Sequence, residues 1–402
     1  MSNYHKNLVF IAACIGMCFF GVSMITLGSV LPSLVIKLGL NSLQTVSLVT
    51  FLPFGMLVGS QVFGPIVDRF GHKALLVPSC IIVLLGMEGL AFFENISMLQ
   101  VSIIGIGLGG GILNGETNAL VADISEEAEK GSRLSFLGMF YGLGALGIPM
   151  LLGILSEHFT YEVILQGIGI IMLAAILFCI PIRFPAPKQA QGFPIKEGVG
   201  LLKESSLLLF SFILFFQSGI EGVCNNWSTS YFGKATDIPA DRALLALTCM
   251  MVGLTVARIL QVVIFKKVKP EKVLPYSLVL TAIGFGLLIF SPDFIRAAIG
   301  MTIVGAGLSA TYPVILSLIG NRYPSLSGTA FSVALAIALV GQTAMNGLMG
   351  VIARNADGIK LYPYLMIASL IIMLLLFRIK ISQYFAISFH CCIFVPNYQP
   401  FG

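Results

Sequence analysis

The sequence GIGLGGGILNGETNALVAD, from Gly105 to Asp123, places a carboxylate inside a run of residues long enough to cross a lipid bilayer. The stretch holds six glycines and two asparagines in addition to Glu116. A charged side chain near the middle of a membrane helix costs about 3 kcal/mol on insertion scales. We therefore expect Glu116 to be protonated, to pair with another residue, or to face a water-filled cavity.

The composition of the whole chain supports a membrane setting. The 402 residues are 57% hydrophobic and 10% charged, with a mean hydropathy of +0.97. Soluble domains carry about 25% charged residues. The composition indicates a polytopic membrane protein and argues against an enzyme, since no span offers a nucleophile–base pair or a metal cluster. We expect no metal and no cofactor. We also expect no nucleic-acid partner, because the net charge of +5 comes from loop lysines and arginines.

Twelve apolar runs approach the length of about 20 residues that a membrane helix needs. They lie near residues 8–36, 43–66, 74–93, 99–123, 134–156, 162–181, 208–232, 243–265, 273–291, 295–319, 329–353 and 361–377. We predict an all-α polytopic membrane protein whose 12 transmembrane helices form two pseudo-symmetric six-helix bundles. The predicted parts are an N-terminal half (1–182), a cytoplasmic linker (183–207), a C-terminal half (208–380) and an atypical tail (381–402).

The distribution of lysine and arginine predicts the orientation, because cytoplasmic loops are enriched in these residues. With a cytoplasmic N-terminus, sixteen of the 23 basic residues fall in cytoplasmic segments, six fall outside, and Arg258 stays within a span. We therefore expect a multi-pass protein of the inner membrane, monomeric in the lipid bilayer, with both termini in the cytoplasm.

The two halves of the sequence contain a recurring short motif. Gly105-Ile-Gly107-Leu108 in the fourth span recurs as Gly305-Ala-Gly307-Leu308 in the tenth. Such an internal duplication puts a substrate site near the membrane midplane, between the halves. The first repeat also satisfies the G-x-G-x-x-G nucleotide-binding pattern, but no strand precedes it. We interpret these glycines as small residues that let membrane helices approach closely.

The stretch GPIVDRFGHK, from Gly64 to Lys73, lies between the second and third spans and is predicted to form a tight cytoplasmic turn. Gly71 permits an unusual backbone angle, and Asp68 can meet a helix N-terminus. The stretch closely resembles the G-x-x-x-D-R-x-G-R-K loop of the major facilitator superfamily, with His72 in place of the usual arginine.

In that superfamily the loop locks the cytoplasmic gate. The resemblance implies a gate formed by Gly64, Asp68, Arg69, Gly71, Lys73 and Asp123. It further implies that Asp68 meets the start of the eleventh span near Gly328, and that Arg69 meets Asp123 at the end of the fourth span.

Polar residues within the spans are candidates for binding a solute. One face of the seventh span carries Gln217, Glu221, Asn225 and Ser228, and a neighbouring i, i+4 pair is Trp227 and Tyr231. Amides and a carboxylate can bond hydroxyl groups while aromatic rings cover C–H faces, which suits a polyol. Interhelical hydrogen bonding is the alternative. Gln342 and Asn346 share a face of the eleventh span.

The sequence leaves the roles of two further polar residues open. Tyr141 is a lone polar residue on the fifth span. Arg258 lies in the cytoplasmic half of the eighth span, where a structural pairing or snorkelling is at least as well supported as contact with a solute.

A finer resemblance is to the fucose/glucose–galactose branch of the superfamily, whose members are mostly sugar:cation symporters. It rests on the first span, on Glu116 with its neighbouring asparagine, and on the Gly219-x-Glu221…Trp227…Tyr231 pattern. It implies that Glu116 carries a proton and that Glu221 binds sugar or a proton. Fucose permeases carry an aspartate in the first span, where this chain has no acid, which favours a glucose-type or other relative.

The sequence therefore predicts a secondary active transporter of a small polar solute, a sugar above all, that works by alternating access with H⁺ or Na⁺ as coupling ion. The substrate-binding candidates are Asn114, Asn118, Gln217, Glu221, Asn225, Trp227, Tyr231, Gln342 and Asn346, and the proton-coupling candidates are Glu116 and Glu221. The alternative is an exporter of drugs or metabolites by proton antiport, which would prefer a more apolar cavity.

A helical wheel divides the stretch that carries Glu116. Asn114 and Asn118 share one face, and Glu116 lies about 160–200° away from them at 100° per residue. An ideal helix cannot direct both sets into one cavity. Either the asparagines contact the solute while Glu116 pairs with a neighbouring helix, or the reverse holds.

Overall fold

The fold is described from a computed structural model that covers residues 4–188, 200–236, 238–290, 293–353 and 358–393. The described elements are helical, and twelve spans among them are long and apolar enough to cross a membrane. This confirms the predicted fold class. Part of the predicted linker (189–199) and the end of the predicted tail (394–402) lie outside the described residues.

Six helices form the N-terminal half: α1 (Lys6–Leu38), α2 (Ser42–Phe70), α3 (Lys73–Phe92), α4 (Ile96–Ile124), α5 (Glu127–Leu155) and α6 (Tyr161–Cys179). The C-terminal half contains α8 (Ser205–Ala235), α9 (Ala240–Ile264), α10 (Pro270–Ile289), α11 (Phe294–Leu308), α12 (Thr311–Arg322), α13 (Ser327–Ile352) and α14 (Tyr362–Ile393). The helices α11 and α12 form one interrupted span, Phe294–Arg322. The last helix continues into the segment predicted as a separate tail.

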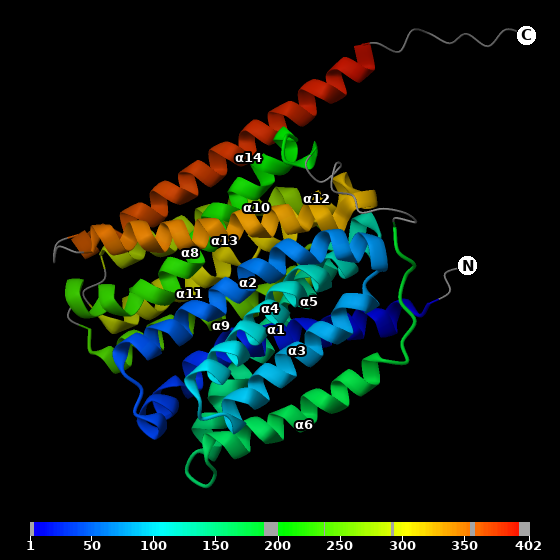
Figure 1. The fold of residues 1–402 in the computed structure, drawn as a ribbon. Helices are drawn as coiled ribbons and strands as arrows, with labels where there is room; N and C mark the ends of the chain where they lie inside the picture. The colour runs from blue at the N-terminus through cyan, green and yellow to red at the C-terminus, as the bar shows by residue number, and fades with distance from the viewer. Residues whose placement is uncertain (1–3, 189–199, 237, 291–292, 354–357, 394–402) are drawn as a thin grey trace, which may run out of the picture.

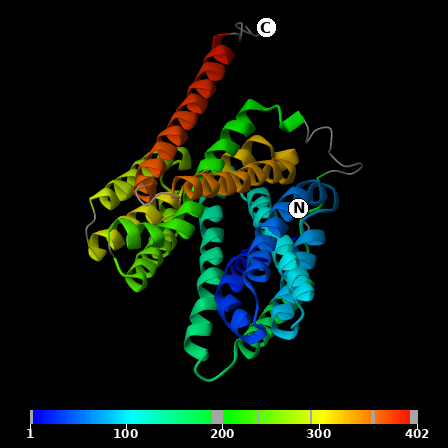
Figure 2. The same cartoon turned by 60° about the vertical axis from the view of Figure 1, so that its left-hand side comes forward.

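The two halves form separate groups of helices, which are labelled in Figure 1. Figure 2 shows the N-terminal half, coloured blue to green-cyan, towards the lower right and the C-terminal half, coloured green to red, towards the upper left. The halves meet where α2 packs against α13 and where α5 packs against α9 and α12. A site between the halves therefore lies next to these contacts.

Glycines set the distance between α4 and α2. A Cβ atom at Gly111 would lie 2.8 Å from the Cα atom of Met56, and one at Gly107 would lie 3.1 Å from the Cα atom of Gly55. A side chain at Gly111 would thus collide with the backbone of α2. The glycine-rich stretch serves close helix packing, which membrane helices achieve with small residues.

The tenth span repeats the packing role of the fourth. A Cβ atom at Gly109 of α4 would lie 2.8 Å from the carbonyl oxygen of Ser79 on α3, and one at Gly307 of α11 would lie 2.8 Å from that of Ser277 on α10. The equivalent neighbours confirm the pseudo-symmetry of the two bundles. In the structure Gly109 corresponds to Gly307, whereas the sequence repeat pairs Gly107 with Gly307. The two alignments therefore differ by two residues.

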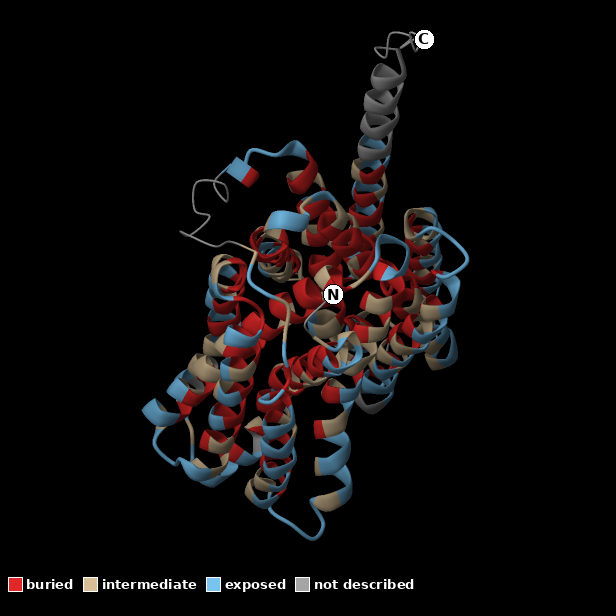
Figure 3. Ribbon diagram, turned by 90° about the vertical axis from the view of Figure 1, so that its right-hand side faces the viewer, coloured by how far each residue is buried: buried red, intermediate tan, exposed pale blue. Residues whose placement is uncertain are grey.

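Residues coloured as buried gather in the interior and exposed residues lie on the outside (Figure 3). Many large apolar residues are among the exposed ones. Ile170 and Ile171 on α6 are 71% and 68% exposed. An apolar outer surface of this kind is expected of helices that face lipid, because the bilayer core offers no partner for polar groups.

Candidate functional site

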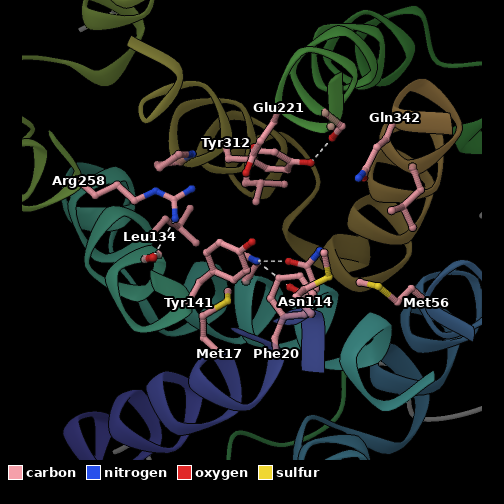
Figure 4. Close-up of a pocket in the computed structure, with 18 of the residues that line it drawn as sticks. Met17, Phe20, Met56, Asn114, Leu134, Tyr141, Glu221, Arg258, Tyr312 and Gln342 are labelled. Atoms are coloured by element: carbon pink, nitrogen blue, oxygen red, sulfur yellow. Dashed lines mark hydrogen bonds between the residues drawn. The ribbon is translucent and has the colours of Figure 1, made fainter. Parts of the chain in front are cut away.

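A cavity lies between the two halves and is lined by side chains from eight helices (Figure 4). The N-terminal half contributes Met17, Phe20, Met24, Met56, Asn114, Asn118, Leu134, Gly138 and Tyr141. The C-terminal half contributes Ser218, Glu221, Gly222, Asn225, Arg258, Tyr312, Pro313, Leu316, Leu339 and Gln342. Both charges of the cavity therefore come from the C-terminal half, and much of the apolar wall comes from the N-terminal half.

Five of the nine substrate-binding candidates line this cavity: Asn114, Asn118, Glu221, Asn225 and Gln342. The Nδ2 atom of Asn118 donates to the backbone oxygen of Asn114 at 2.7 Å, which ties its side chain to its own helix. The Oδ1 atom of Asn225 is buried and has no hydrogen-bond partner among the described residues. A buried acceptor without a partner is costly, so this oxygen is available to a hydroxyl group of a solute.

The other four candidates lie outside the lining of the cavity and serve contacts between helices. The Nε2 atom of Gln217 donates to the carbonyl oxygen of Leu308 at 3.1 Å, and the hydroxyl of Tyr231 donates to that of Leu288 at 3.0 Å. Asn346 accepts a 2.9 Å hydrogen bond from Asn226. Trp227 lies against Gly350 of α13.

The geometry of α8 explains why only some of its polar residues line the cavity. At 100° per residue, a stripe spaced i, i+4, i+8 drifts by 40° at each step. The helix spans 31 residues and packs against α9, α13 and α14 as well as facing the cavity. Only part of the polar stripe can therefore face the solute, and interhelical bonding accounts for the rest.

The sequence left open whether Arg258 serves a structural role or contacts a solute, and the structure places it at the cavity. Its guanidinium lines the cavity and donates from Nη1 to the carbonyl oxygen of Gly138 at 2.9 Å. It also lies 5.9 Å from the ring centroid of Tyr141, a distance that permits a cation–π interaction. Tyr141 and Tyr312 complete the polar part of the wall, and the Tyr312 hydroxyl is hydrogen bonded to Ser218.

A set of polar contacts joins the two halves at the ends of α2 and α4. The carboxylate of Asp68, at the end of α2, accepts hydrogen bonds from the backbone N–H of Gly328 (3.3 Å) and of Thr329 (2.9 Å) and from the Thr329 hydroxyl (2.6 Å). This is the contact that the family resemblance implied. A carboxylate is favoured at a helix N-terminus because it meets unsatisfied N–H groups and the positive end of the helix dipole.

Asp123, at the end of α4, adds to these contacts between the halves. Its carboxylate accepts from the Ser327 hydroxyl at 2.8 Å and pairs with Lys188 at 2.6 Å and with His72 at 3.0 Å. Lys188 lies in the chain segment between the halves and also contacts Ser327. We call Asp68, His72, Asp123, Lys188, Ser327 and Thr329 the inter-half cluster.

The remaining gate candidates surround the inter-half cluster. Gly64 lies tightly against α13, since a Cβ atom there would be 2.6 Å from the carbonyl oxygen of Gly328. Gly71 ends α2 with a φ angle of +82°, in the region that favours glycine. Lys73 donates to the carbonyl oxygen of Ile180 at 2.5 Å. The guanidinium of Arg69 lies 5.8 Å from the Phe70 ring centroid.

Glu116 lies on the side of α4 away from the cavity. Its side chain is fully buried, and Oε1 lies 3.2 Å from Nδ1 of His72. Of the two arrangements that the helical wheel left open, the structure shows the one in which the asparagines face the cavity and Glu116 pairs sideways.

His72 bridges two carboxylates. Nδ1 faces Glu116 and Nε2 faces Asp123, and when both carboxylates are ionised each ring nitrogen donates a proton, which describes the imidazolium form. Burial alone would lower the pKa of His72, but the hydrogen bonds and charges of Asp123 and Glu116 outweigh it and raise the pKa from 6.5 to about 9. The bridge is therefore charged at neutral pH.

We predict that the stability contributed by His72 depends on pH. A raised pKa gives stabilisation that is complete below pH 6.5 and is lost as the pH rises through about 9, worth about 3 kcal/mol at most. The thermal unfolding midpoint of the detergent-solubilised protein should fall over this range, and a His72→Gln variant should be less stable at pH 6.5 with a weaker dependence on pH. Equal pH dependence in both proteins would contradict the prediction. The exposed His158 supplies the control His158→Gln, which should match the wild type.

Comparison with known families agrees with the twelve-span architecture. A family model described as Major Facilitator Superfamily matches residues 13–271. The glucose/mannose transporter GlcP of Bacillus subtilis is 24% identical over 354 residues, which cover 83% of this chain and 86% of that protein. The multidrug resistance protein MdtH of Aeromonas hydrophila is 31% identical over 139 residues, about 34% of each chain.

Among solved structures, the chain is similar to the E. coli fucose:proton symporter FucP. The two share 19% sequence identity and a TM-score of 0.75, with 92% of this chain and 98% of that chain covered. FucP in its outward conformation gives a TM-score of 0.76 with the same coverage. At this level of identity the likeness shows the fold.

Proposed function

Because the chain belongs to the major facilitator superfamily, and is thus a transporter rather than an enzyme, we propose that it carries a sugar or a related polyhydroxylated solute by proton-coupled alternating access. The observation that supports this most is the cavity between the halves, where amide side chains accompany the single carboxylate of Glu221. Amides and a carboxylate bond hydroxyl groups, and Phe20 and Tyr141 can cover the C–H faces of a sugar ring.

The inter-half cluster supplies the gate for this cycle. In the proposed orientation it lies at the cytoplasmic face, with both termini on that side, and holds the cavity closed to the cytoplasm. Solute enters from outside, the two halves rock about the cavity, and separation of α2 from α13 opens the other side. We propose that the protein does this as a monomer in the inner membrane.

Glu221 is the proposed proton carrier. It faces the cavity at about the middle of α8, so a proton can reach it together with the solute. Glu116, the other candidate, is buried away from the cavity and holds His72. We propose that Glu116 acts on the gate through His72 rather than as the carrier.

Solute counterflow in proteoliposomes tests the proposed function. Vesicles loaded with unlabelled sugar should take up labelled solute from a panel of hexoses, amino sugars and sugar acids, and protein-free vesicles should not. A chain that exchanges no carbohydrate of any kind contradicts the proposal.

A second candidate is an exporter of apolar drugs or metabolites. It is favoured by the apolar part of the cavity wall, where Met17, Met24 and Met56 lie near Phe20 and Leu134. Methionine-rich surfaces adapt to varied ligands. The partial similarity to MdtH points the same way. Proton-driven efflux of a fluorescent dye, without carbohydrate exchange, would establish this function instead.

A further inference from the structure

Arg258 is a buried cation whose bonding capacity is largely unused. The residue is 7% exposed, its Nε atom has no partner, and Nη1 reaches the Gly138 carbonyl oxygen. Among the described residues it forms no ion pair within 4.0 Å. A guanidinium offers five N–H donors in a planar fork. A buried charge with donors to spare, lining a cavity, indicates a ligand that supplies acceptors.

Glu221 is the counter-charge of this cavity. It lies on α8, while Arg258 lies on α9, and Figure 4 shows both side chains in the cavity together with that of Tyr312. The ionisable groups that interact with Glu221 are Arg258, Tyr141, Tyr312 and the thiol of Cys224, which lies on the same helix. With Glu221 ionised, the empty cavity carries one positive and one negative charge and is neutral overall.

The net charge of the cavity determines which kind of solute favours the binding of a proton to Glu221. A neutral sugar leaves the balance between Arg258 and Glu221 unchanged, so its binding does not favour protonation of Glu221. A carboxylate bound to Arg258 adds a second negative charge, and one proton on Glu221 restores neutrality. In a cavity shielded from water such a balance matters, because charges interact there far more strongly than in bulk water.

We propose that the solute is a sugar acid, a polyhydroxylated monocarboxylate whose carboxylate binds Arg258 and which enters together with one proton on Glu221. This deepens the proposed function and rests on it. Arginine suits the role because its fork matches the two oxygens of a carboxylate. The hydroxyl groups meet Asn114, Asn225 and Gln342 on the other walls. The transported charge is zero, since the anion and the proton cross together.

Uptake by proteoliposomes tests this, with D-gluconate, D-glucuronate and D-glucose as probes. We expect an Arg258→Gln variant to raise the KM for the two acids about 30-fold, and Arg258→Lys to give an intermediate value because it keeps the charge but loses the fork. The exposed Arg296 supplies the control, since Arg296→Gln should match the wild type. A measurable KM in Arg258→Gln shows that this variant itself folds, and counterflow by Arg258→Lys shows the same for the lysine variant.

An electrical measurement on the wild type needs no variant. One anion with one proton makes uptake electroneutral, so a potassium diffusion potential set with valinomycin should leave gluconate uptake unchanged. Glucose exchange with equal KM in the wild type and in Arg258→Gln, without exchange of the acids, overturns this inference and leaves carbohydrate transport standing. Acceleration of acid uptake by an inside-negative potential also overturns it. Absence of exchange for all three probes overturns this inference, and absence across the whole carbohydrate panel overturns the proposed function as well.

Discussion

Replacing Glu221 by glutamine is expected to abolish accumulation driven by a pH gradient while counterflow continues. Glutamine keeps the size and the hydrogen-bonding oxygen of the side chain but cannot take up a proton. Counterflow exchanges solute without net proton movement, so it does not need that step. Concentrative uptake by Glu221→Gln proteoliposomes under an inside-alkaline gradient should fall about 100-fold or more.

Glu88 provides the matched control for this change. It is another glutamate within a span, on α3, and it lies against Gly169 of α6 rather than in the cavity. Glu88→Gln should accumulate solute like the wild type. Glu116→Gln should keep its proton coupling while losing stability, because Glu116 holds His72. Undiminished accumulation by Glu221→Gln would show that the proton moves elsewhere.

Replacing Asp68 by asparagine is expected to weaken the closed end of the cavity and to reduce transport at least tenfold. Oδ2 accepts from both the N–H and the hydroxyl of Thr329, and an amide nitrogen in its place would put donors against donors. A hydrogen bond to a charged group is worth about 1.5–3 kcal/mol, and each 1.4 kcal/mol changes an equilibrium tenfold. Even one lost bond should thus shift the balance between closed and open states.

Initial uptake rates and the thermal unfolding midpoint of purified Asp68→Asn measure this effect. Asp293 offers the control because it also accepts a hydrogen bond from a helix N-terminus, at Arg296 of α11, but on an exposed surface. Asp293→Asn should transport normally. If Asp68→Asn transports at the wild-type rate and its unfolding midpoint is unchanged, the inter-half cluster is not the gate.

The sequence alone predicts the spans well because the bilayer dictates their length and composition. The fold class and family are confirmed, and the opposed faces of α4 follow from helix geometry. Asn114 and Glu116 had to point apart, although only tertiary packing decides which of them faces the cavity. The glycines at 107 and 111 turn one face of α4 toward α2, and His72 meets Glu116 on the opposite side.

Two features of the site could not be predicted for physical reasons. Depth along its span placed Arg258 near the cytoplasm, but whether its side chain reaches the cavity depends on where α9 crosses α5, which a single helix does not show. Lys188 belongs to an irregular segment without periodicity, so nothing in the sequence ties it to Asp123. Tyr231 shows the opposite error. Its spacing from Trp227 predicted contact with the solute, but its ring packs against Tyr362.

Proton-driven accumulation tests the central claim most directly. Purified protein in proteoliposomes with an inside-alkaline pH gradient is offered labelled D-gluconate and D-glucose, and the internal concentration is measured with and without a protonophore. The proposed mechanism predicts that one of these solutes rises above its external concentration, that the protonophore collapses the gradient, and that Glu221→Gln only equilibrates it. Equilibration without accumulation in the wild type, whatever the pH gradient, would contradict it.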